Sequence, residues 1–445
     1  MKRFRSWMGG LARRGIIMLG TVQRKRLRAV RIVGITGSAG KTTAKDLSLA
    51  VLSSRLHGKA NRFTHNRPVQ IAQMLLCSSP KDDFLVQEIS VEALGYADQQ
   101  IALLRPQIGV VTCVGLDHYA AFRSLESVAK EKGKLISSLP AEGWAILNAD
   151  DPLVLDMRRN TKARVITYGL SSTADFRAED ICSDWPNRLS FTARFGPTAA
   201  RVQSQLLGAH WTSSILAALA VGHAFDIPLD VAAEAISKVP PVNGRMSPVI
   251  LPGPITFVRD DVKAPLWSIS HALAFVRTAK ATRKIIVIGT LSDVPGNTSR
   301  KYQRVAREAI AAADIACFVG PQSHLVEKVK KEAEPDRLLT FPVLTEVHAY
   351  LQKTLMPGDL VFLKGSILAD HLARLVLARE APITCWREKC LYEYACAGCR
   401  HLRAQVPRSD VSGQVLAKTR GPHESRFSLF KTLRRHHHQS QCHPH

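Results

Sequence analysis

A glycine-rich segment followed by a lysine and two threonines constrains this chain more than any other feature. Residues 34–43 read Gly-Ile-Thr-Gly-Ser-Ala-Gly-Lys-Thr-Thr. An apolar, strand-like run precedes the segment, and apolar residues with helical spacing follow it at Leu47, Val51 and Leu52. A tight turn between a strand and a helix directs several backbone N–H groups and the positive end of the helix at one point, and such a point binds phosphate. The segment therefore predicts a nucleotide-binding loop.

The polar residues of this loop have expected roles in binding ATP. Lys41 would reach the outer phosphates, and the hydroxyl group of Thr42 would bind Mg²⁺. A plain tight turn would explain the glycines but not the Gly-Lys-Thr sequence that follows them. The residues expected to contact the nucleotide are Thr36, Gly37, Ser38, Ala39, Gly40, Lys41, Thr42 and Thr43.

Length and composition indicate a globular protein with two or three domains. The chain has 445 residues, of which 46% are apolar and 22% are charged. No apolar run approaches the roughly 18–20 residues that are needed to span a bilayer. The nine cysteines are an odd number and are unevenly spread, so they do not indicate a disulfide framework. An ATP-using enzyme without an export signal is expected in the cytoplasm.

The positive charge of the chain is concentrated at its two ends. Residues 1–31 contain ten Lys or Arg and no acidic residue, and residues 403–445 carry +6, so the rest contributes only +8 of the net charge of +24. Solvated tails would explain this pattern. The alternative is peripheral contact with an anionic membrane surface or an acidic polymer, because residues 4–21 mix arginines with apolar side chains. Nucleic acid is the weakest candidate partner, because no recognised nucleic-acid motif accompanies the charge.

Strand-like apolar runs alternate with helical patterns, which predicts an α/β fold with parallel sheets. We expect a central P-loop ATPase domain with a parallel sheet, a smaller Rossmann-like C-terminal α/β domain, a short Cys-rich module and a disordered tail. The predicted boundaries are a basic amphipathic leader at 1–30, the ATP-binding domain at 31–243, the C-terminal domain at 244–384, the Cys-rich module at 385–402 and the basic, His-rich tail at 403–445. Strands are predicted at 31–35, 84–89, 108–114, 144–147, 164–168, 256–258, 284–288, 315–319 and 360–363.

Two further segments are candidates for binding Mg²⁺ beside the loop. Glu88 ends a predicted strand, where α/β sheets bind ligands, and hard cations take oxygen donors. An exposed acidic loop is the simpler interpretation of this residue. His118 follows another predicted strand, and the Lys-Glu-Lys-Gly-Lys run that begins at Lys130 has the charge spacing of a solvated helical face.

The spacing of the loop resembles that of the Mur ligase family, which includes folylpolyglutamate synthetase and whose members use ATP to join a carboxylate to an amine. The usual glycine six residues before the loop lysine is Ile35 here, and Gly34 lies seven before it. The stretch 116–136 looks like the family segment that carries a metal-binding histidine and a carbamylated lysine. His118 matches the histidine and Lys132 matches the lysine. Partial burial lowers the pKa of a lysine and favours its reaction with CO₂. The resemblance implies Thr42, Glu88, His118 and carbamylated Lys132 as Mg²⁺ ligands.

The second half of the chain continues the resemblance. Residues 243–246 are similar to the family's Gly-Arg at the start of its last domain, which implies that Arg245 faces the phosphates of ATP. A later strand-end motif implies that Asp261 orients ATP and that Lys263 contacts the γ-phosphate. Its form, Asp-x-Lys-Ala, is most similar to the branch that adds D-glutamate. Residues 358–366 match the pattern Gly-Asp-x-Val-x-x-Lys-Gly-Ser.

Three positions depart from the family pattern. Trp211 and Ser214 replace two asparagines, the first of which usually contacts adenine, and Ile367 replaces an arginine. The aromatic ring at position 211 could instead stack on the base. Wall-building members also carry an N-terminal domain that holds a UDP-sugar substrate, whereas only about thirty residues precede the loop here, too few for a domain.

A cysteine cluster follows the last predicted helix. Its members are Cys385, Cys390, Cys396 and Cys399, and His401 lies beside it. Four thiolates that end in Cys-x-x-Cys suit tetrahedral Zn²⁺, and such a site would be structural because it leaves no open position. Reduced structural cysteines or redox chemistry are the alternatives.

The residues and the resemblance together favour an ATP-dependent amide ligase in cell-envelope or polymer biosynthesis. ATP would phosphorylate a carboxylate on a small-molecule, lipid-linked or polymer-linked substrate, and an amino acid or peptide amine would attack the acyl phosphate. The expected catalytic residues are Lys41, Lys132, Arg245 and Lys263. The rival hypothesis is a non-catalytic ATP-binding adaptor that engages a membrane or a partner protein. The substitutions at the three departing positions favour the adaptor, and the intact ligand set opposes it.

Overall fold

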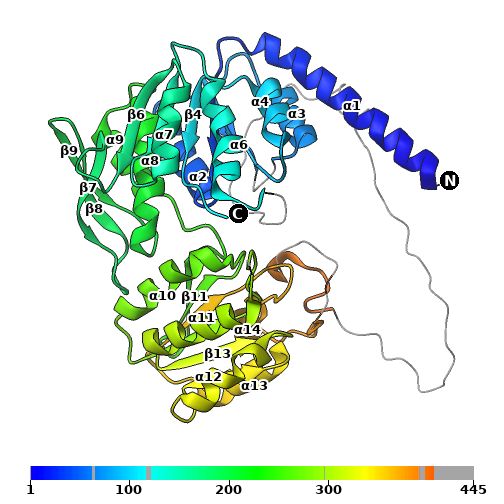
Figure 1. The fold of residues 1–445 in the computed structure, drawn as a ribbon, viewed down its shortest axis with the longest axis vertical. Helices are drawn as coiled ribbons and strands as arrows, with labels where there is room; N and C mark the ends of the chain where they lie inside the picture. Colours follow the sequence, from blue (N-terminus) through cyan, green and yellow to red (C-terminus); the bar gives the residue numbers. More distant parts are fainter. Residues whose placement is uncertain are drawn as a thin grey trace. The chain divides into compact units, whose positions relative to one another are not determined.

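Two β-sheets organise the part of the chain that the structure describes (Figure 1). The computed structural model describes residues 2–62, 66–116, 122–294, 296–388, 390 and 396–404, except for the side chains of residues 2–11. From position 405 onward, the tail predicted at 403–445 lies outside the described residues.

The first sheet has nine strands in the order β2-β3-β1-β4-β5-β6-β7-β8-β9. Neighbouring strands from β2 to β7 are parallel, and β8 is antiparallel to both of its neighbours. The strands are β1 (Arg31–Thr36), β2 (Gly58–Ala60), β3 (Phe84–Glu88), β4 (Ile108–Val111), β5 (Trp144–Asn148), β6 (Arg164–Gly169), β7 (Phe176–Cys182), β8 (Ser190–Phe195) and β9 (Thr198–Gln203).

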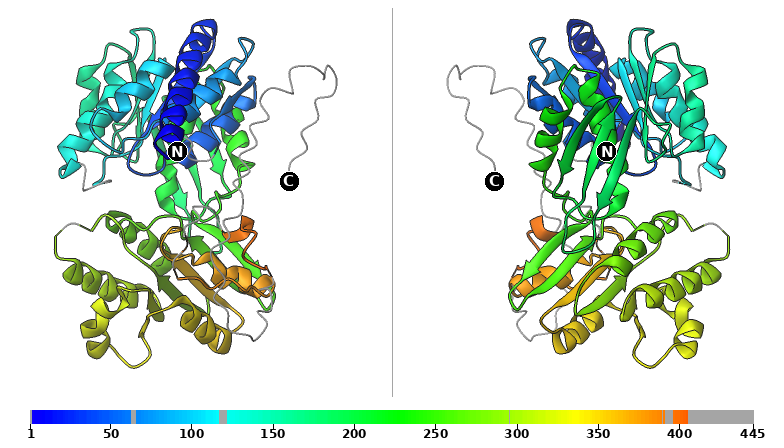
Figure 2. Two further views of the ribbon diagram at one scale, coloured as in Figure 1. Left: turned by 90° about the vertical axis from the view of Figure 1, so that its right-hand side faces the viewer. Right: turned by 90° about the vertical axis from the view of Figure 1, so that its left-hand side faces the viewer.

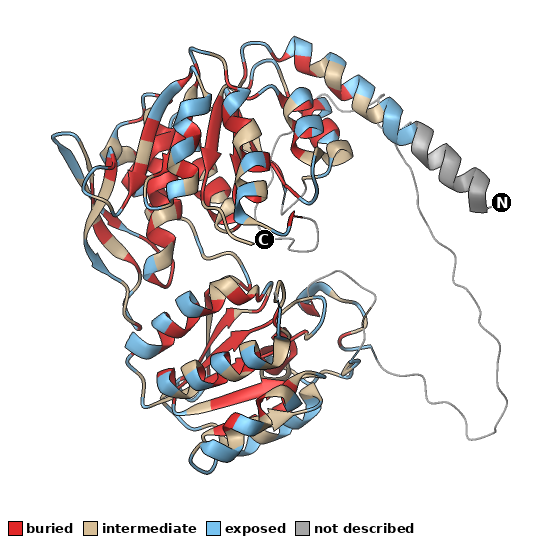
Figure 3. Ribbon diagram, in the orientation of Figure 1, coloured by how far each residue is buried: buried red, intermediate tan, exposed pale blue. Residues whose placement is uncertain are grey.

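Helices cover both faces of this sheet because successive side chains of its central strands point to opposite faces. Val33 and Val86 belong to one hydrophobic cluster, whereas Ile32 and Leu85 belong to another. The first cluster includes residues of α2 (Lys41–Ser53), α8 (Thr212–His223) and α9 (Leu229–Ser237). The second includes residues of α3 (Pro68–Leu76), α4 (Tyr96–Leu104), α6 (Leu125–Ser137) and α7 (Pro152–Asp156). Buried residues accordingly concentrate in the strands and on the inner sides of the helices (Figure 3).

The second sheet has six strands in the order β10-β11-β15-β12-β13-β14. Only the β10–β11 pair is antiparallel among these strands. They are β10 (Ser247–Leu251), β11 (Ile255–Asp260), β12 (Arg283–Ile288), β13 (Ile315–Val319), β14 (Leu338–Phe341) and β15 (Asp359–Lys364). The helices that flank this sheet, seen from two sides in Figure 2, are α10 (Ile269–Thr278), α11 (Thr298–Ala312), α12 (Glu327–Glu332), α13 (Leu344–Thr354) and α14 (Ala373–Glu380).

A buried arginine fixes the end of the N-terminal helix, α1 (Lys2–Arg26), to the first sheet's helical layer. Arg24 is only 6% exposed. Its guanidinium group donates hydrogen bonds to the backbone oxygens of Leu104 and Arg105, at the end of α4. These bonds satisfy a charged group that would be costly to bury alone. Within the described residues, no helix combines the length and apolar character that crossing a membrane requires.

The predicted fold class is confirmed: the chain is α/β, with one large, mainly parallel sheet and a second, smaller sheet. The nine predicted strands correspond to β1, β3, β4, β5, β6, β11, β12, β13 and β15. Sequence patterns missed β2, β10, β14 and the antiparallel extension β7–β9.

Candidate active site

The loop between β1 and α2 requires glycine at two positions. Gly37 and Gly40 have φ angles of 146° and 76°, a region that side chains disfavour. A Cβ atom at Gly37 would collide with Oγ1 of Thr112, and one at Gly40 would lie 2.8 Å from Oγ of Ser214. The chain therefore passes close to its neighbours at both glycines, and α2 begins directly after Gly40.

Hydrogen bonds hold this loop against the segment that follows β4. The amide of Ser38 donates to the carbonyl oxygen of Cys113 at 2.9 Å. The hydroxyl group of Ser38 donates to the carbonyl oxygen of Gly115 at 2.9 Å. Oγ1 of Thr112 also donates to the carbonyl oxygen of Ala39. These bonds hold the loop in one conformation. Nζ of Lys41 also donates to the carbonyl oxygen of Gly37.

Glu88 lies at the same edge of the first sheet as the loop. It pairs in register with Ile35, next to the last residue of β1. Its side chain is 1% exposed, and its Oε1 atom has no hydrogen-bond partner among the described residues. A buried, unpaired carboxylate oxygen is costly unless a cation or a proton satisfies it. The oxygen therefore fits the Mg²⁺ ligand that the sequence predicts, and Thr42, 5% exposed, begins the adjacent helix.

Burial distinguishes Lys132 from the other lysines of α6. Lys130 is exposed, and Lys134 forms ion pairs with Asp98 and Glu131 at 2.7 and 2.8 Å. Lys132 is 2% exposed. The solvated-face interpretation therefore describes its neighbours but not Lys132, and burial is what carbamylation requires. His118, the other expected ligand here, lies outside the described residues.

The strands of the second sheet end in an acidic and basic cluster. Nζ of Lys364 donates to Oδ2 of Asp260 at 2.6 Å, across a pair of residues in register on β11 and β15. Arg259 donates to both carboxylate oxygens of Asp261 at 3.1 Å. Burial raises the pKa of Asp261, against the opposing effect of Arg259. Asp261 is 3% exposed and paired within the protein, and its expected contact with ATP stays a prediction.

A cleft of about 370 Å³ brings together five of the predicted site residues, whereas Lys41, Thr42, Glu88, Lys132 and Asp261 are not part of its lining. This volume lies in the range of small-molecule sites. The predicted residues that line the cleft are Ser38, Ala39, Gly40, Arg245 and Lys263. Asn148 and Asp150 also line it, and they lie in the segment 148–151, which follows a predicted strand and resembles a family segment near the nucleotide. Sequence reasoning assigned no individual role to Asp260, Trp267, His271 and Lys364, which line the cleft as well. Lys364 and Asp150 were marked by their position directly after strand-like runs, whereas nothing in the sequence distinguished His271.

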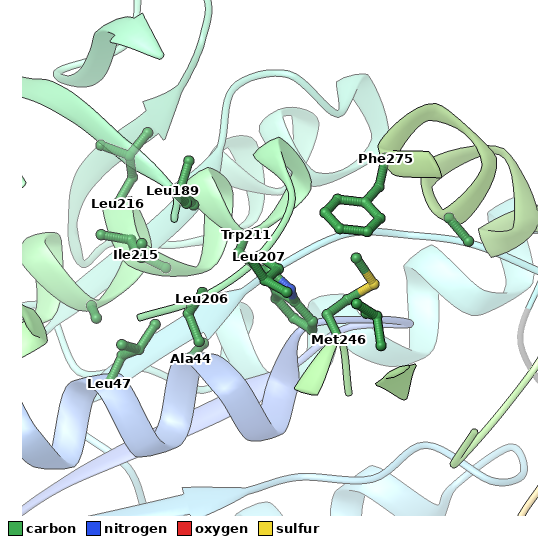
Figure 4. Close-up of a cluster of buried hydrophobic side chains, with 14 of the residues drawn as sticks. Ala44, Leu47, Leu189, Leu206, Leu207, Trp211, Ile215, Leu216, Met246 and Phe275 are labelled. Atoms are coloured by element: carbon green, nitrogen blue, oxygen red, sulfur yellow. The ribbon is translucent and has the colours of Figure 1, made fainter. Parts of the chain in front are cut away.

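Trp211 also lines the cleft, but its ring is largely buried. It is 8% exposed and belongs to the cluster that includes Leu207 and Met246 (Figure 4). Its Nε1 atom has no hydrogen-bond partner among the described residues. The neighbouring His210 has a ring centroid 4.7 Å from that of Trp211. Burial lowers the pKa of His210 to about 4, so that its imidazole is neutral at pH 7. The stacking of Trp211 on a base stays a prediction.

The four cysteines of the C-terminal cluster line one small cavity together with His371, Arg374 and His401. Within the described residues, no three His, Cys, Asp or Glu side chains already stand in a metal-binding arrangement. The four thiols are therefore gathered in one place but do not surround a common point.

Comparison with known proteins identifies both halves of the chain. The family model for the Mur ligase middle domain matches residues 35–222, and that for the Mur ligase glutamate ligase domain matches residues 244–367. UDP-N-acetylmuramoyl-tripeptide–D-alanyl-D-alanine ligase of Mycobacterium tuberculosis (strain CDC 1551 / Oshkosh) is 30% identical over 376 residues, or 80% of this chain and 74% of the relative. The enzyme of the same name from Escherichia coli K12 is 28% identical over 299 residues, or 66% of each chain.

Solved structures show the same fold. A crystal structure of MurF from Acinetobacter baumannii superposes with a TM-score of 0.75 and 20% identity, covering 83% of this chain and 81% of that one. MurF ligase from Thermotoga maritima in complex with ADP superposes with a TM-score of 0.72 and 18% identity, covering 82% of this chain and 84% of that one.

Proposed function

We propose substrates for this chain from the names of its relatives. The chain belongs to the Mur ligase family. It is an ATP-dependent ligase that forms an amide bond and releases ADP. The adaptor hypothesis does not fit this assignment. The carboxylate that we propose is the peptide carboxylate of a UDP-N-acetylmuramoyl-tripeptide, and the proposed amine is that of D-alanyl-D-alanine, because the relatives carry these compounds in their names.

The reaction needs charge neutralisation and positioning more than covalent participation of the protein. A carboxylate oxygen attacks the γ-phosphorus of ATP and ADP leaves; the amine then attacks the acyl carbon, and phosphate leaves with the original carboxylate oxygen. We assign Lys41 to the phosphates on the side of the first sheet, and Arg245 and Lys263 to the phosphates on the side of the second. The observation that carries this assignment is the cleft, which is lined by Arg245, Lys263 and the loop residues 38–40 that directly precede Lys41.

Mg²⁺ would bind beside the loop and offset the charge of the phosphate oxygens. We propose Thr42, Glu88, His118 and carbamylated Lys132 as its ligands. The buried, unpaired oxygen of Glu88 and the burial of Lys132 support this set. With the metal in place, Glu88 would hold it against the loop, and carbamylated Lys132 would supply a further oxygen donor from α6.

Four finer points are also proposals. The domain boundaries at 31–243 and 244–384 enclose the two segments that match family models. The Cys-rich module at 385–402 binds a structural Zn²⁺, as its cysteine spacing predicts. The enzyme works in the cytoplasm, and its basic ends contact an anionic membrane surface through charge and the apolar side chains between the arginines.

The substrate proposal is tested with purified protein, Mg-ATP, the UDP-linked tripeptide and D-alanyl-D-alanine. We expect ADP release that requires both organic substrates, with a product whose mass equals their sum less one water. Lys41→Ala should abolish release. ADP release could instead depend on another compound in an envelope extract, identified by mass spectrometry. That result would leave the ligase assignment intact and overturn the proposed substrates.

A further inference from the structure

Cations outnumber carboxylates in the lining of the cleft. Within the described residues, its cationic side chains are Arg245, Lys263 and Lys364, and its carboxylates are Asp150 and Asp260. The other titratable groups of the lining are Cys113, His210 and His271. Cations attract the phosphates of ATP and the reacting carboxylate but repel an ammonium group. The amine substrate is mostly an ammonium ion at pH 7, because the pKa of an α-amino group is about 7.7–8.0, so it needs a carboxylate of the cleft as its partner.

Two of the nearby carboxylates are already bound by groups of the protein. Oδ2 of Asp150 accepts a hydrogen bond from the amide of Leu170 at 2.7 Å, and its Oδ1 accepts from the amide of Ser171 at 2.9 Å. Both oxygens thus hold the turn after β6. Asp261 likewise accepts from Arg259 with both oxygens, and it does not line the cleft. An ammonium group at either residue would have to share an oxygen with a donor of the protein.

Asp260 differs from both of these residues. Its Oδ2 accepts a hydrogen bond from Nζ of Lys364 at 2.6 Å, whereas none of the described residues donates a hydrogen bond to its Oδ1. The side chain of Asp260 is 18% exposed, against 6% for Lys364. Asp260 therefore offers one carboxylate oxygen without a protein donor at a position that lines the cleft.

The strands of the second sheet hold this carboxylate in place. Asp260 is the last residue of β11 and pairs in register with Lys364, the last residue of β15. Lys364 in turn pairs in register with Ile288 at the end of β12, and its carbonyl oxygen accepts from the amide of Gly289 at 2.8 Å. A carboxylate that is fixed by an ion pair at the ends of packed strands keeps its second oxygen in one position, as the orientation of a nucleophile requires.

We propose that Asp260 binds the ammonium group of the amine substrate and accepts one of its protons as the amide bond forms. This assignment rests on the ligase reaction proposed above and extends it to the nucleophile. An ammonium nitrogen has no lone pair, so it cannot attack the acyl phosphate. Transfer of one proton to Asp260 frees the lone pair, the nitrogen bonds to the acyl carbon, and phosphate leaves with the electron pair of the C–O bond. A second proton passes from the nitrogen to the departing phosphate, and Asp260 returns the first to solvent.

Hydroxylamine separates this role from a structural one, because it is largely uncharged at pH 7 and attacks an acyl phosphate without a base. The full-length chain is assayed with Mg-ATP, the UDP-linked tripeptide and either D-alanyl-D-alanine or hydroxylamine. Asp260→Asn should lower amide formation with the dipeptide about 100-fold or more and keep the wild-type rate of hydroxamate formation. Asp260→Glu should recover part of the dipeptide rate. Glu332→Gln, which removes an exposed ion pair with Arg307 in the same half of the chain, should match the wild type with both nucleophiles.

The pH dependence of the dipeptide reaction gives a second measurement that a structural role would not change. The neutral form of the amine becomes abundant as the pH rises through the α-amino pKa of about 7.7–8.0. The deficit of Asp260→Asn relative to the wild type should therefore shrink above this range with the dipeptide, whereas hydroxamate formation should show no such change.

A measurement on the wild-type chain alone decides the question if Asp260→Asn does not fold. An analogue of D-alanyl-D-alanine that lacks the amino group cannot form the charge-assisted hydrogen bond to Asp260. It should therefore bind at least about tenfold more weakly than the dipeptide, measured by competition in the wild-type reaction.

Three results would overturn the assignment of Asp260. One is ligation of the dipeptide by Asp260→Asn at the wild-type rate. The second is equal loss of amide and hydroxamate formation in this variant, which would make its pair with Lys364 a structural contact only. The third is equal binding of the dipeptide and the analogue without the amino group. Failure of the proposed substrates would instead appear in the wild-type chain, as absence of both products, and the same comparison would then use the compounds that support ADP release.

Discussion

At the scale of single residues, burial distinguishes the side chains that sequence patterns alone leave equivalent. Lys130, Lys132 and Lys134 share one charged run, yet only Lys132 is buried. Glu88 is one acidic residue among many, yet its Oε1 atom is buried without a partner among the described residues. The chemistry proposed for both residues depends on this desolvation, because burial favours the neutral amine that reacts with CO₂ and makes a cation a favourable partner for the Glu88 oxygen.

Lys132→Ala should lower kcat about 100-fold or more, because it removes the carbamate oxygens that we propose for Mg²⁺. Added acetate or bicarbonate should restore part of the rate by occupying the vacated space. The measurement is ADP release with saturating substrates. Lys130→Ala, two residues away on the exposed side of α6, is the matched control and should retain the wild-type rate. Full activity of Lys132→Ala with unchanged Mg²⁺ dependence would exclude the carbamate role.

His210 should make the protein less stable in acid. Burial lowers its pKa to about 4 from 6.5, and Asp260, which raises it, and His271 and Lys364, which lower it, face the same imidazole. The unfolded chain therefore binds a proton between pH 6.5 and 4 that the folded chain does not. The contribution of His210 to the free energy of unfolding should be fully present above pH 6.5. It should fall toward pH 4 by no more than about 3 kcal/mol.

Urea denaturation of the wild-type chain and His210→Gln between pH 4 and 8 checks this prediction. The difference between the two proteins isolates His210, since every other titrating group is common to both. The difference should diminish as the pH falls. A difference that does not change with pH would mean that the imidazole is solvated in the folded state.

At the scale of secondary-structure elements, most of the predicted strands are buried on both faces, and β6, which is exposed at Arg164 and Val165, is the exception. The predicted run at 284–288 became β12, which is apolar for most of its length. β8 alternates instead, with Phe191 and Ala193 buried and Ser190, Thr192 and Arg194 partly exposed. Alternation of this kind was the available signal for β8, whereas burial along β7 and β9 follows no such pattern. β2 has only three residues, too few for any periodic pattern to identify it.

Gly40→Ala should weaken ATP binding at least about tenfold. Alanine at this position would have to adopt a left-handed backbone conformation, which costs about 1–2 kcal/mol. Its methyl group would also lie too close to Oγ of Ser214. Gly253→Ala is the matched control, because Gly253 has a similar φ of 81° but open space around its Cα atom. Calorimetric titration with ATP should show wild-type affinity for the control only. Equal affinities in the two variants would mean that the loop tolerates displacement.

At the scale of the whole molecule, the sequence predicted the ligand edges of both sheets but not the set of side chains around the cleft. Thr36 and Glu88 end β1 and β3, and Asp260 and Lys364 end β11 and β15. Parallel sheets bind ligands at this edge, which is why motif residues could be placed from the chain alone. His271 and Trp267 enter the cleft through tertiary packing, which leaves no local pattern. The similarity of Asp-x-Lys-Ala to the D-glutamate-adding branch is not supported by the relatives, whose names specify D-alanyl-D-alanine.

The central claim is that this chain activates a carboxylate through an acyl phosphate within an ATP-dependent ligase reaction. The most direct measurement uses a tripeptide substrate whose reacting carboxylate is labelled with oxygen-18, followed by mass analysis of the released phosphate. Each released phosphate should carry one labelled oxygen, and no label should appear in ADP. Unlabelled phosphate from a reaction that still forms the amide would contradict it.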